Sequence, residues 1–415
     1  MKNDNIDKGN IYKPIYYGNW EEKILYDLAV WKNGLAFKNI NFTDIGKPVI
    51  KIAELKNGIT SQTKFTQDIF DDSVCLTKGD MLFSWSGNPE TSIDVFYYDL
   101  PDGWLNQHIF KITTKDDVFY KYFFYILKYL KPNFTVIATN KQTTGLGHVT
   151  INDLKRIKIK LPPLEEQKKI ASILSSLDDK IELNNRMNKI LEETAQTIFK
   201  EWFINFNFPN EEGKPYKKSG GKMIESELGE IPDGWEVTTL ENILKVIKGK
   251  KPKETHIKKT DLLNSQYLTI DCYNNSNIEY TEYVEKMYVD KLDIIMVMDG
   301  ASSGKLFYGK NGILSSTMAK FYVENKNINE IVFFFLKKIE NEIMYHTTGS
   351  AIPHANKQFI LNKKIALPPK QLLNLTNYIK TIREKIISNT EENQKLAGIR
   401  DSILPKLMSG EIRIK

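Results

Sequence analysis

The chain has 415 residues, which exceeds one ordinary hydrophobic core and fits two domains of about 150 residues with connecting elements. Hydrophobic residues make up 41% and aromatic residues 11%, which excludes a globally disordered protein. The formal net charge of +6 is mildly basic, so it permits a polyanionic partner without requiring one.

The N-terminal segment carries no apolar signal region, and no stretch approaches the roughly 18 consecutive apolar residues that span a bilayer. The two cysteines, Cys75 and Cys272, lie far apart in the sequence, which excludes a disulfide framework and favours a reducing compartment. We therefore expect a soluble cytoplasmic protein without membrane contact.

The first half of the chain predicts a mixed α/β domain over residues 1–160. After Trp20 come two β-type runs, PVIKIAEL and KGDMLFSW, and then the phenylalanine-rich helical stretch YKYFFYILKYL. A Thr-Thr-Gly turn at 143–145 and a Leu-Pro-Pro sequence at 161–163 follow. This order of features defines a unit that can be sought elsewhere in the chain.

The second half repeats the unit at an offset of about 205 to 218 residues. It contains Trp235, then QYLTIDCY, KLDIIMVM and NEIVFFFLKKIE, and finally a second Thr-Thr-Gly turn and a second Leu-Pro-Pro sequence. Residues 206–230 are rich in Pro, Gly, Lys and Glu, the composition of an exposed linker. We therefore predict a tandem duplication, with a second mixed α/β domain over residues 231–366.

A long helix is expected after each Leu-Pro-Pro sequence, the first within residues 161–205 and the second, with a C-terminal tail, within residues 367–415. Apolar residues recur there at spacings of four and three, which is typical of a heptad seam. Two seam positions in each helix hold asparagine instead: Asn184 and Asn188 in the first, and Asn389 and Asn393 in the second.

If the two helices pack antiparallel, Asn184 faces Asn393 and Asn188 faces Asn389, so that the amides satisfy one another and fix the register. The expected fold is therefore α+β: two tandem mixed α/β domains, each followed by a long helix, with the helices forming a pseudo-two-fold antiparallel coiled coil. Two alternatives remain open, in which each helix packs on its own domain or the seam is a homodimer contact.

The second domain begins with a lysine-rich segment, KVIKGKKPKETHIKK, in which Glu254 is the only acidic residue. Such a run can neutralise several phosphates, with binding that weakens as salt rises, although a solvated loop is the alternative interpretation. The candidates for DNA contact in this segment are Lys250, Lys251, Lys253, Lys258 and Lys259.

Polar turns in both halves suit contact with a duplex. DGASSGKLFYG in the second domain and SWSGNPET in the first follow equivalent β-type runs, and WLNQHIF and NKQTTG add side chains that can pair with adenine or guanine. The glycine spacing and Leu306 exclude a Walker loop, and an ordinary hairpin turn remains the alternative. The candidates are Trp85, Ser86, Asn88, Asn106, Gln107, Lys141, Gln142, Ser302, Ser303 and Lys305.

No catalytic chemistry is evident in the sequence. The five histidines lack metal-ligand spacing, the Pro-Pro pairs lack the preceding Asn or Asp of an adenine methyltransferase motif, and no carboxylate cluster of the nuclease type is complete. We therefore predict no catalytic residue, no metal site and no cofactor in this chain.

Four stretches resemble the specificity subunits of type I restriction-modification systems, over about residues 15–415. They are LPPLEEQKKIASILSSLDDKIELNN, the linker GKPYKKSGGKMIESELGEIPDGWEV, the second Leu-Pro-Pro sequence with its helix, and ILPKLMSGEIRI. The resemblance implies two target-recognition domains, each binding one half of a bipartite DNA site, with the helices as a ruler. The second helix departs from the pattern, because it opens with LPPKQLLNL and lacks the EEQ of the first.

The resemblance also implies partners. These are double-stranded DNA, two adenine-N6 methylating subunits that bind S-adenosylmethionine, and a translocating restriction subunit that uses ATP and Mg²⁺. An orphan recognition subunit without a restriction partner, a self-sufficient DNA methyltransferase and a coiled-coil scaffold without a DNA role are the alternatives.

Overall fold

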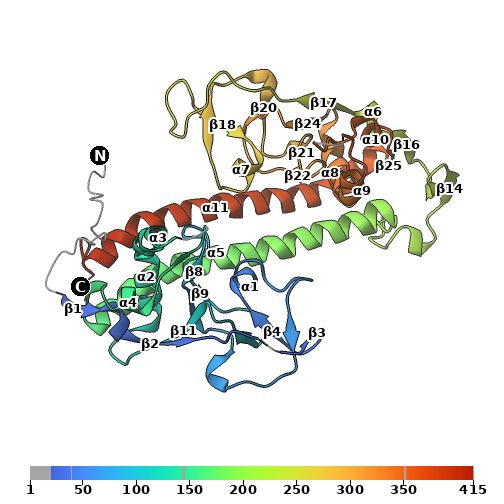
Figure 1. The fold of residues 1–415 in the computed structure, drawn as a ribbon. Coiled ribbons are helices and arrows are strands. Elements are labelled where there is room, and N and C mark those ends of the chain that lie inside the picture. Colours follow the sequence, from blue (N-terminus) through green and yellow to red (C-terminus); the bar gives the residue numbers. More distant parts are fainter. Residues whose placement is uncertain (1–19, 39, 143–144, 350–351, 415) are drawn as a thin grey trace. The chain divides into compact units, whose positions relative to one another are not determined.

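The computed structural model describes residues 20–38, 40–142, 145–349 and 352–414 (Figure 1). The chain packs as two units. One comprises the chain up to Ile181 together with the segment from Gln394 onward, and the other comprises Glu182–Asn393. The long helices α5 (Leu164–Phe199) and α11 (Thr376–Ser409) therefore each contribute one part of their length to each unit.

Two sheets form the body of the first unit. The four-stranded antiparallel sheet has the order β2 (Ala29–Asn33), β11 (Ile109–Thr114), β7 (Met81–Ser84) and β9 (Asp94–Tyr97). The five-stranded sheet has the order β3 (Phe42–Thr43), β5 (Phe65–Thr66), β4 (Lys47–Ile50), β10 (Gly103–Leu105) and β6 (Cys75–Leu76), in which β4 and β10 run parallel.

Short pairs and helices complete the first unit. β1 (Glu21–Ile24) pairs with β13 (Lys158–Leu161), and β8 (Ser86–Gly87) pairs with β12 (Gly147–His148). The helices are α1 (Ile52–Asn57), α2 (Tyr120–Tyr129), α3 (Lys131–Asn140) and α4 (Ile151–Leu154), with 3-10 turns at η1 (Leu25–Leu28) and η2 (Asp72–Val74). The phenylalanine-rich stretch forms α2, whose side chains from Tyr122 to Leu127 are all buried.

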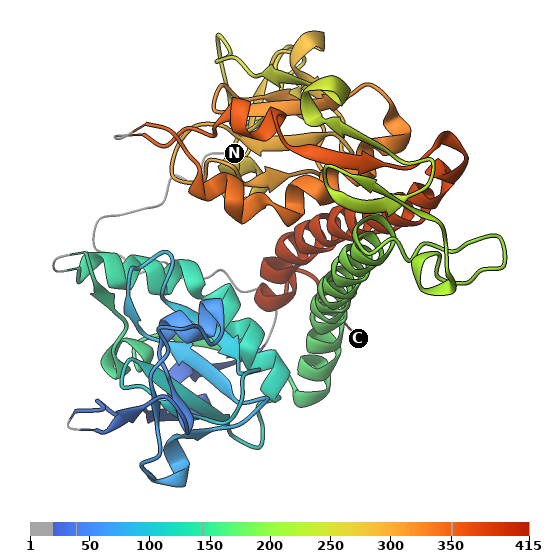
Figure 2. The same cartoon turned by 90° about the vertical axis from the view of Figure 1, so that its right-hand side faces the viewer.

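The second unit repeats this topology (Figure 2). One sheet has the order β17 (Leu244–Lys248), β24 (Met318–Val323), β21 (Ile294–Val297) and β22 (Leu306–Phe307). The other has the order β19 (Glu279–Thr281), β18 (Ser265–Leu268), β23 (Gly312–Leu314) and β20 (Tyr288–Val289), and again one pair, β18 and β23, runs parallel. β16 (Glu236–Thr239) pairs with β25 (Lys364–Leu367), as β1 pairs with β13.

The remaining elements of the second unit are short. They are the helical segments η3 (Lys200–Ile204) and η4 (Lys217–Ser219), the hairpin β14 (Met223–Ser226) and β15 (Gly229–Pro232), α6 (Leu240–Ile243), α7 (Ile270–Tyr273), η5 (Glu285–Met287), η6 (Lys326–Ile328), α8 (Asn329–Lys338), α9 (Glu340–Tyr345), α10 (Lys357–Leu361) and η7 (Lys370–Leu375). The matching sheet orders confirm the prediction of two tandem mixed α/β domains.

One strand at the centre of each domain feeds two hydrophobic cores. In β7, Met81 and Phe83 join the core that contains α2, whereas Leu82 joins the core of the five-stranded sheet. In β21, Ile294 and Ile295 divide between two cores in the same way. Successive side chains of a strand point to opposite faces, so a strand between two layers must be apolar throughout.

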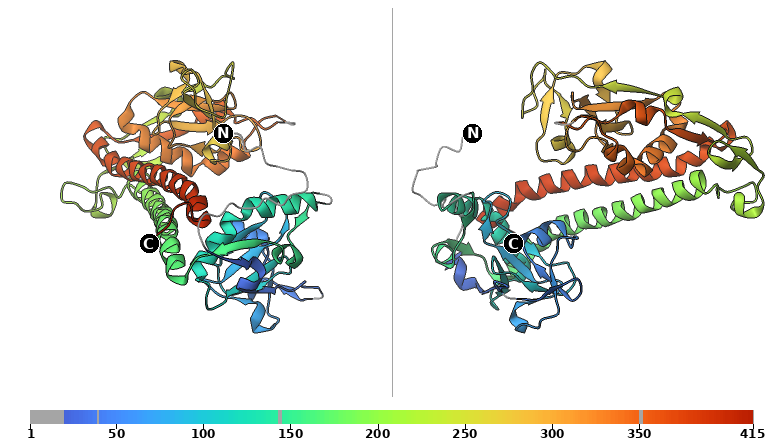
Figure 3. Two further views of the ribbon diagram at one scale, coloured as in Figure 1. Left: turned by 90° about the vertical axis from the view of Figure 1, so that its left-hand side faces the viewer. Right: turned by 45° about the vertical axis from the view of Figure 1, so that its right-hand side comes forward.

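The antiparallel pairing of the two long helices is confirmed within each unit (Figure 3). In the second unit, Asn184 Nδ2 donates to Asn393 Oδ1 at 2.8 Å and Asn389 Nδ2 donates to Asn188 Oδ1 at 2.8 Å. In the first unit, the Arg400 guanidinium donates to Asp178 at 2.6 Å. From Asp178 to Asn188 the residue numbers increase along α5, while those of their partners decrease from Arg400 to Asn389 along α11. The two helices therefore run in opposite directions.

Each helix also packs on its own domain, so that pairing and domain contact occur together. Ile170 and Leu174 of α5 lie in the core of the first domain. On α11, the guanidinium of Arg383 is fully buried and donates to Glu330 at 2.8 Å. A helix has room for both contacts because its two buried stripes lie on different faces.

The predicted linker holds more structure than its composition suggests. It contains β14 and the first two residues of β15, which pair as a hairpin. Phe208 is buried, and its ring stacks on Trp235 with centroids 5.6 Å apart. The start of this segment therefore belongs to the core of the second domain. Burial of an aromatic side chain contributes more free energy of folding than the polar residues beside it lose.

Candidate nucleic-acid interface

One end of the four-stranded sheet of the first domain brings three polar segments together. β2 ends at Asn33 and β7 at Ser84, and β11 begins between them at Ile109, because it pairs antiparallel with both. The indole Nε1 of Trp85, which follows β7, donates to Asn33 Oδ1 at 3.1 Å. The Trp85 ring lies 5.5 Å from the ring of His108, which precedes β11. These ends form one surface.

The second domain has the same arrangement. β17 ends at Lys248, β21 ends at Val297, and β24 begins between them at Met318. The backbone N–H of Met298 donates to the carbonyl of Thr317 at 2.8 Å. The turn after β21 therefore lies beside the segment before β24 and the start of the lysine-rich segment.

A glycine lets the strands converge in each domain. A Cβ on Gly34 would lie 2.3 Å from the carbonyl oxygen of Asn106, and one on Gly249 would lie 2.1 Å from that of Ser315. A carbon and an oxygen cannot approach so closely without a shift of the backbone. Both domains thus need a residue without a side chain at the same place.

A further segment meets each surface. In the first domain, β12 pairs with β8, and His148 Nδ1 lies 2.9 Å from Ser86 Oγ. In the second domain, His354 Nδ1 lies 2.7 Å from Asp299 Oδ1. Lys248 Nζ lies 2.8 Å from Oδ2 of the same carboxylate. Thr143 and Thr144 of the first Thr-Thr-Gly turn lie outside the described residues.

Two titratable groups at these surfaces depart from their ordinary behaviour. Although burial alone would raise it, the pKa of Asp299 lies below its usual value, because Lys248 and His354 both bond to its carboxylate. Burial lowers the pKa of His108, and the neighbouring His148 lowers it further. Asp299 is therefore an anion whose charge is locally balanced, and His108 is neutral near pH 7.

Five of the first-domain candidates reach solvent. Asn88 and Gln142 are exposed, and Trp85 and Gln107 are half-buried. Lys141 is exposed but forms an ion pair with the buried Asp153, at 2.5 Å. A phosphate would have to compete with that carboxylate for Lys141.

Three candidates are buried, in contrast to the exposed donors expected. The Ser303 hydroxyl lies within hydrogen-bond distance of three backbone carbonyls, those of Met298, Gly300 and Pro353. Ser86 is buried against His148, as described above, and Asn106 Oδ1 accepts from the backbone N–H of His108. A buried polar group is kept by its hydrogen bonds, so these three shape the turns themselves.

The lysine candidates of the second domain are all exposed, and none of them forms an ion pair within the part of the chain that the structure describes. They are Lys250, Lys251, Lys253, Lys258 and Lys259. Lys305 is also exposed, with Nζ 5.3 Å from the centre of the Phe307 ring, and Ser302 is half-buried. These cations are free to meet phosphates.

Sequence reasoning missed Asn33, Asp299, His148 and His354 as members of these surfaces. A signal was present for the histidines, because one follows each Thr-Thr-Gly turn within a few residues. Nothing in the sequence marked Asn33, which strand register brings in, whereas Asp299 opens the polar turn DGASSGKLFYG but was not chosen as a candidate.

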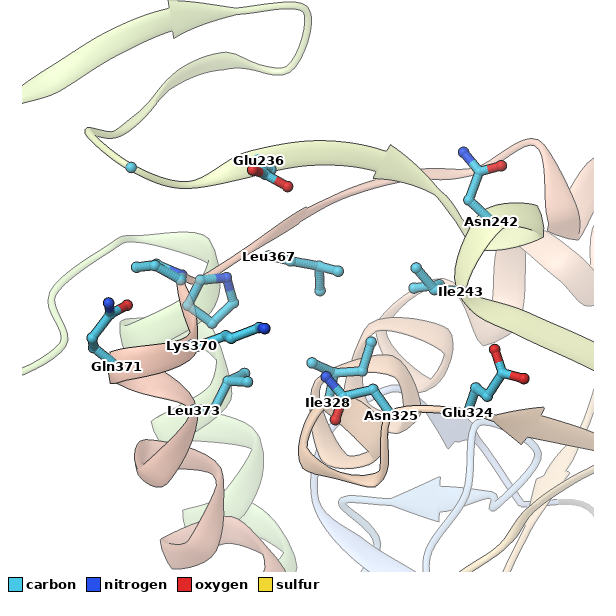
Figure 4. Close-up of a pocket in the computed structure, with 13 residues that line it drawn as sticks. Glu236, Asn242, Ile243, Glu324, Asn325, Ile328, Leu367, Lys370, Gln371 and Leu373 are labelled. Atoms are coloured by element: carbon cyan, nitrogen blue, oxygen red, sulfur yellow. The ribbon is translucent and has the colours of Figure 1, made fainter.

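A pocket of about 680 Å³ lies where β25 of the second domain leads into η7 (Figure 4). Glu236, Asn242, Glu324 and Lys370 are among the residues that line it. At the equivalent place in the first domain, α5 contributes a buried glutamine.

That glutamine is Gln167, which is buried. Its Oε1 accepts from the backbone N–H of Phe119 at 2.8 Å, and its Nε2 donates to the carbonyls of Asp117 and Pro162. Counted from the Leu-Pro-Pro sequence, Leu373 stands at the corresponding position in the second domain, where it lines the pocket and cannot make these bonds. The sequence departure noted in the second Leu-Pro-Pro helix thus replaces a buried, hydrogen-bonded glutamine with a leucine that lines the pocket.

The family model described as the type I restriction modification DNA specificity domain matches residues 17–193 and again residues 232–394. The chain belongs to this family. Each match covers one of the two domains with most of its long helix, so the specificity chain carries two specificity domains in tandem. Membership gives it a recognition role and no catalytic one, and it implies DNA and the methylating and restricting components of a type I system as partners.

Two relatives from Methanocaldococcus jannaschii align along most of the specificity chain. It is 32% identical to the type I restriction enzyme MjaIX specificity subunit over 75% of this chain and 73% of that protein. It is 28% identical to the putative MjaX specificity subunit over 96% and 94%. A crystal structure of the type I restriction-modification S subunit from M. genitalium shares its fold, with a TM-score of 0.61 at 17% identity over 96% and 99% of the two chains.

Within the described residues, no helix is long and apolar enough to cross a membrane. The same residues contain no group of three or more His, Cys, Asp or Glu side chains placed to hold a metal ion.

Proposed function

We propose that the specificity chain reads a bipartite duplex target, one half with each domain, through the polar end of the four-stranded sheet in that domain. The observation that carries the proposal is that the same four features meet at the same end of the four-stranded sheet in both domains. They are the last residue of β2 or β17, the polar turn after β7 or β21, the segment before β11 or β24, and a segment that carries a histidine. A recognition site that is duplicated with the fold, yet differs in side chains, suits two half-sites of different sequence.

The contacts proposed for the first domain are base-reading ones. Trp85, Asn88, Gln107, Lys141 and Gln142 offer amides, a cation and an indole, types that reach base edges in a groove. Ser86 and Asn106 are proposed to hold these side chains in place.

The contacts proposed for the second domain begin with phosphates, because unpaired lysines crowd its surface. They neutralise the backbone and position the domain, while the turn before Lys305 approaches the bases. The proposed residues are Lys250, Lys251, Lys253, Lys258, Lys259, Ser302 and Lys305, with Ser303 shaping the turn.

We propose domain boundaries that match this division of labour. Residues 1–160 and 231–366 are the two target-recognition domains, residues 161–205 and 367–415 are the spacer helices with the C-terminal tail, and residues 206–230 are the linker. Asn184, Asn188, Asn389 and Asn393 fix the register of the spacer. A helix of about 36 residues is about 54 Å long, so the register sets the distance between half-sites.

The partners proposed for the assembled system are two adenine-N6 methylating subunits and one kind of ATP-dependent restriction subunit. S-adenosylmethionine, ATP and Mg²⁺ belong to those partners. The presence of two domain–helix junctions in one chain, each following a Leu-Pro-Pro sequence, supports two copies of the methylating subunit, one at each junction.

Methylome sequencing of a host that expresses this chain with its cognate methylating subunit tests the proposal. The expected result is adenine N6 methylation in a motif of two short parts separated by a fixed number of unspecified bases. Methylation at a continuous motif, or none above the background of a host without this chain, would contradict it.

A further inference from the structure

In each domain a histidine side chain bonds to the turn that follows β7 or β21 and so links that turn to its own segment. His354 Nδ1 bonds to Asp299, and His148 Nδ1 bonds to Ser86. A backbone bond lies beside each: the N–H of the residue after the histidine donates to the residue before its partner, at 2.8 Å in both domains. The repeat has kept the histidine and the backbone bond while exchanging the partner side chain.

The histidines are placed too near the surface to contribute much to the cores. The side chain of His354 is 49% exposed and that of Asp299 is 22% exposed. A single hydrogen bond between such solvent-exposed side chains contributes little to net stability. Its main effect is therefore to choose the position of the turn, not to hold the domain together.

In the second domain, the contacts of Asp299 with His354 and Lys248 also balance the charge of its carboxylate. Both carboxylate oxygens of Asp299 are occupied, one by His354 and the other by Lys248. A carboxylate without these partners would repel a phosphate. With both partners in place, the Asp299 carboxylate instead fixes the direction of the Lys248 side chain. The same arrangement brings the start of the lysine-rich segment to the turn that carries Ser302 and Lys305.

We propose that His354 and His148 are positioning residues for target recognition, each clasping the turn of its own domain to the neighbouring segment so that both present one surface to one half-site. The inference rests on the proposed function. It adds that each histidine governs the half-site of its own domain and leaves the other half-site unaffected.

The test uses the full chain in complex with its methylating subunit and the duplex target found by methylome sequencing. Competition binding is measured with duplexes that carry single-base changes in one half or the other. His354→Ala is expected to lower discrimination about tenfold in the half read by the second domain, because one well-placed base contact is worth about that much. Discrimination in the other half is expected to stay within about twofold.

Two variants separate positioning from general damage. His354→Asn retains a donor near the place of Nδ1 and is expected to restore discrimination. His346→Ala removes a histidine from the same segment, one whose ring stacks on Phe359 with centroids 4.3 Å apart, and is expected to leave both halves unchanged. His148→Ala and His148→Asn are expected to give the mirror result in the other half-site.

If His354→Ala does not fold, as judged by its melting temperature, Asp299→Ala removes the partner of the imidazole and is expected to relax the same half-site. The inference is overturned if discrimination is unchanged in these variants, or if both half-sites weaken equally. A wild-type complex that shows no bipartite preference would instead overturn the proposed function, which is a different outcome of the same assay.

Discussion

The side-chain amide of Asn184 donates a 2.8 Å hydrogen bond to Oδ1 of Asn393, and Asn184 is fully buried. Asn393 donates in turn to Oδ1 of Asn185 at 2.8 Å, and Asn184 also donates to Glu392. A slip of either helix would leave the buried amide of Asn184 without partners, which costs more than the bonds themselves contribute. The pair therefore favours one register over its neighbours.

Replacing Asn184 alone by leucine is expected to lower the stability of the helix pair by about 1–3 kcal/mol, since it leaves the Asn393 carboxamide without its donor. The double change Asn184→Leu with Asn393→Leu is expected to raise stability instead while loosening register. Thermal unfolding midpoints of the two variants check this. A double variant that melts well below the wild type would show that the pairing contributes more than register.

The lysine-rich segment is expected to set the salt dependence of DNA binding. Changing Lys250, Lys251 and Lys253 together to alanine should reduce the slope of log affinity against log salt by up to about 0.9 for each phosphate that is no longer neutralised. Affinity measured from low to moderate salt gives the slope. The matched control changes Lys214, Lys217 and Lys218 of the linker, and an equal reduction there would mean that net charge alone is responsible.

Gly249→Ala is expected to destabilise the second domain by about 1–3 kcal/mol, because its Cβ would meet the carbonyl of Ser315. Gly398→Ala is the control: a Cβ there meets nothing within 4 Å, and in the helix it should add about 0.5–1 kcal/mol of stability. Chemical denaturation of both variants would show opposite shifts. A tolerated Gly249→Ala would refute the close approach.

Gln167→Leu copies into the first domain the residue found at the equivalent place in the second. It removes three hydrogen bonds to buried backbone groups and is expected to cost about 1–3 kcal/mol. Lys169→Leu, on the exposed face of the same helix turn, is expected to have little effect. Melting temperatures that fall equally in both variants would show that the hydrogen bonds of Gln167 make no specific contribution to stability.

Lengthening both spacer helices by one heptad is expected to increase the gap between half-sites without changing either half. Seven helical residues add about 10 Å, which corresponds to about 3 base pairs of duplex. The insertions belong at facing positions, so that the Asn184–Asn393 pair is preserved. Methylome sequencing reads the new gap, and an unchanged gap would defeat the idea of a ruler.

The sequence by itself determined the duplication, the long helices and the seam asparagines, because each is written as a pattern along one chain. Apolar periodicity predicts a helix wherever it occurs, and the recurrence of Asn184 and Asn188 as Asn389 and Asn393 allowed an antiparallel pairing in which these amides meet. The positions of the polar turns could also be located in the sequence, since turn residues are local signals.

Only the tertiary structure decided which side chains of those turns face solvent. Ser303, Ser86 and Asn106 are polar residues in polar segments, yet strand register places them against carbonyls, an imidazole and a backbone amide. The hydrogen bond between His354 and Asp299 and the pocket lined by Leu373 likewise join residues far apart in sequence. Such contacts depend on how strands pair and helices dock, and local pattern carries no information about distance through space.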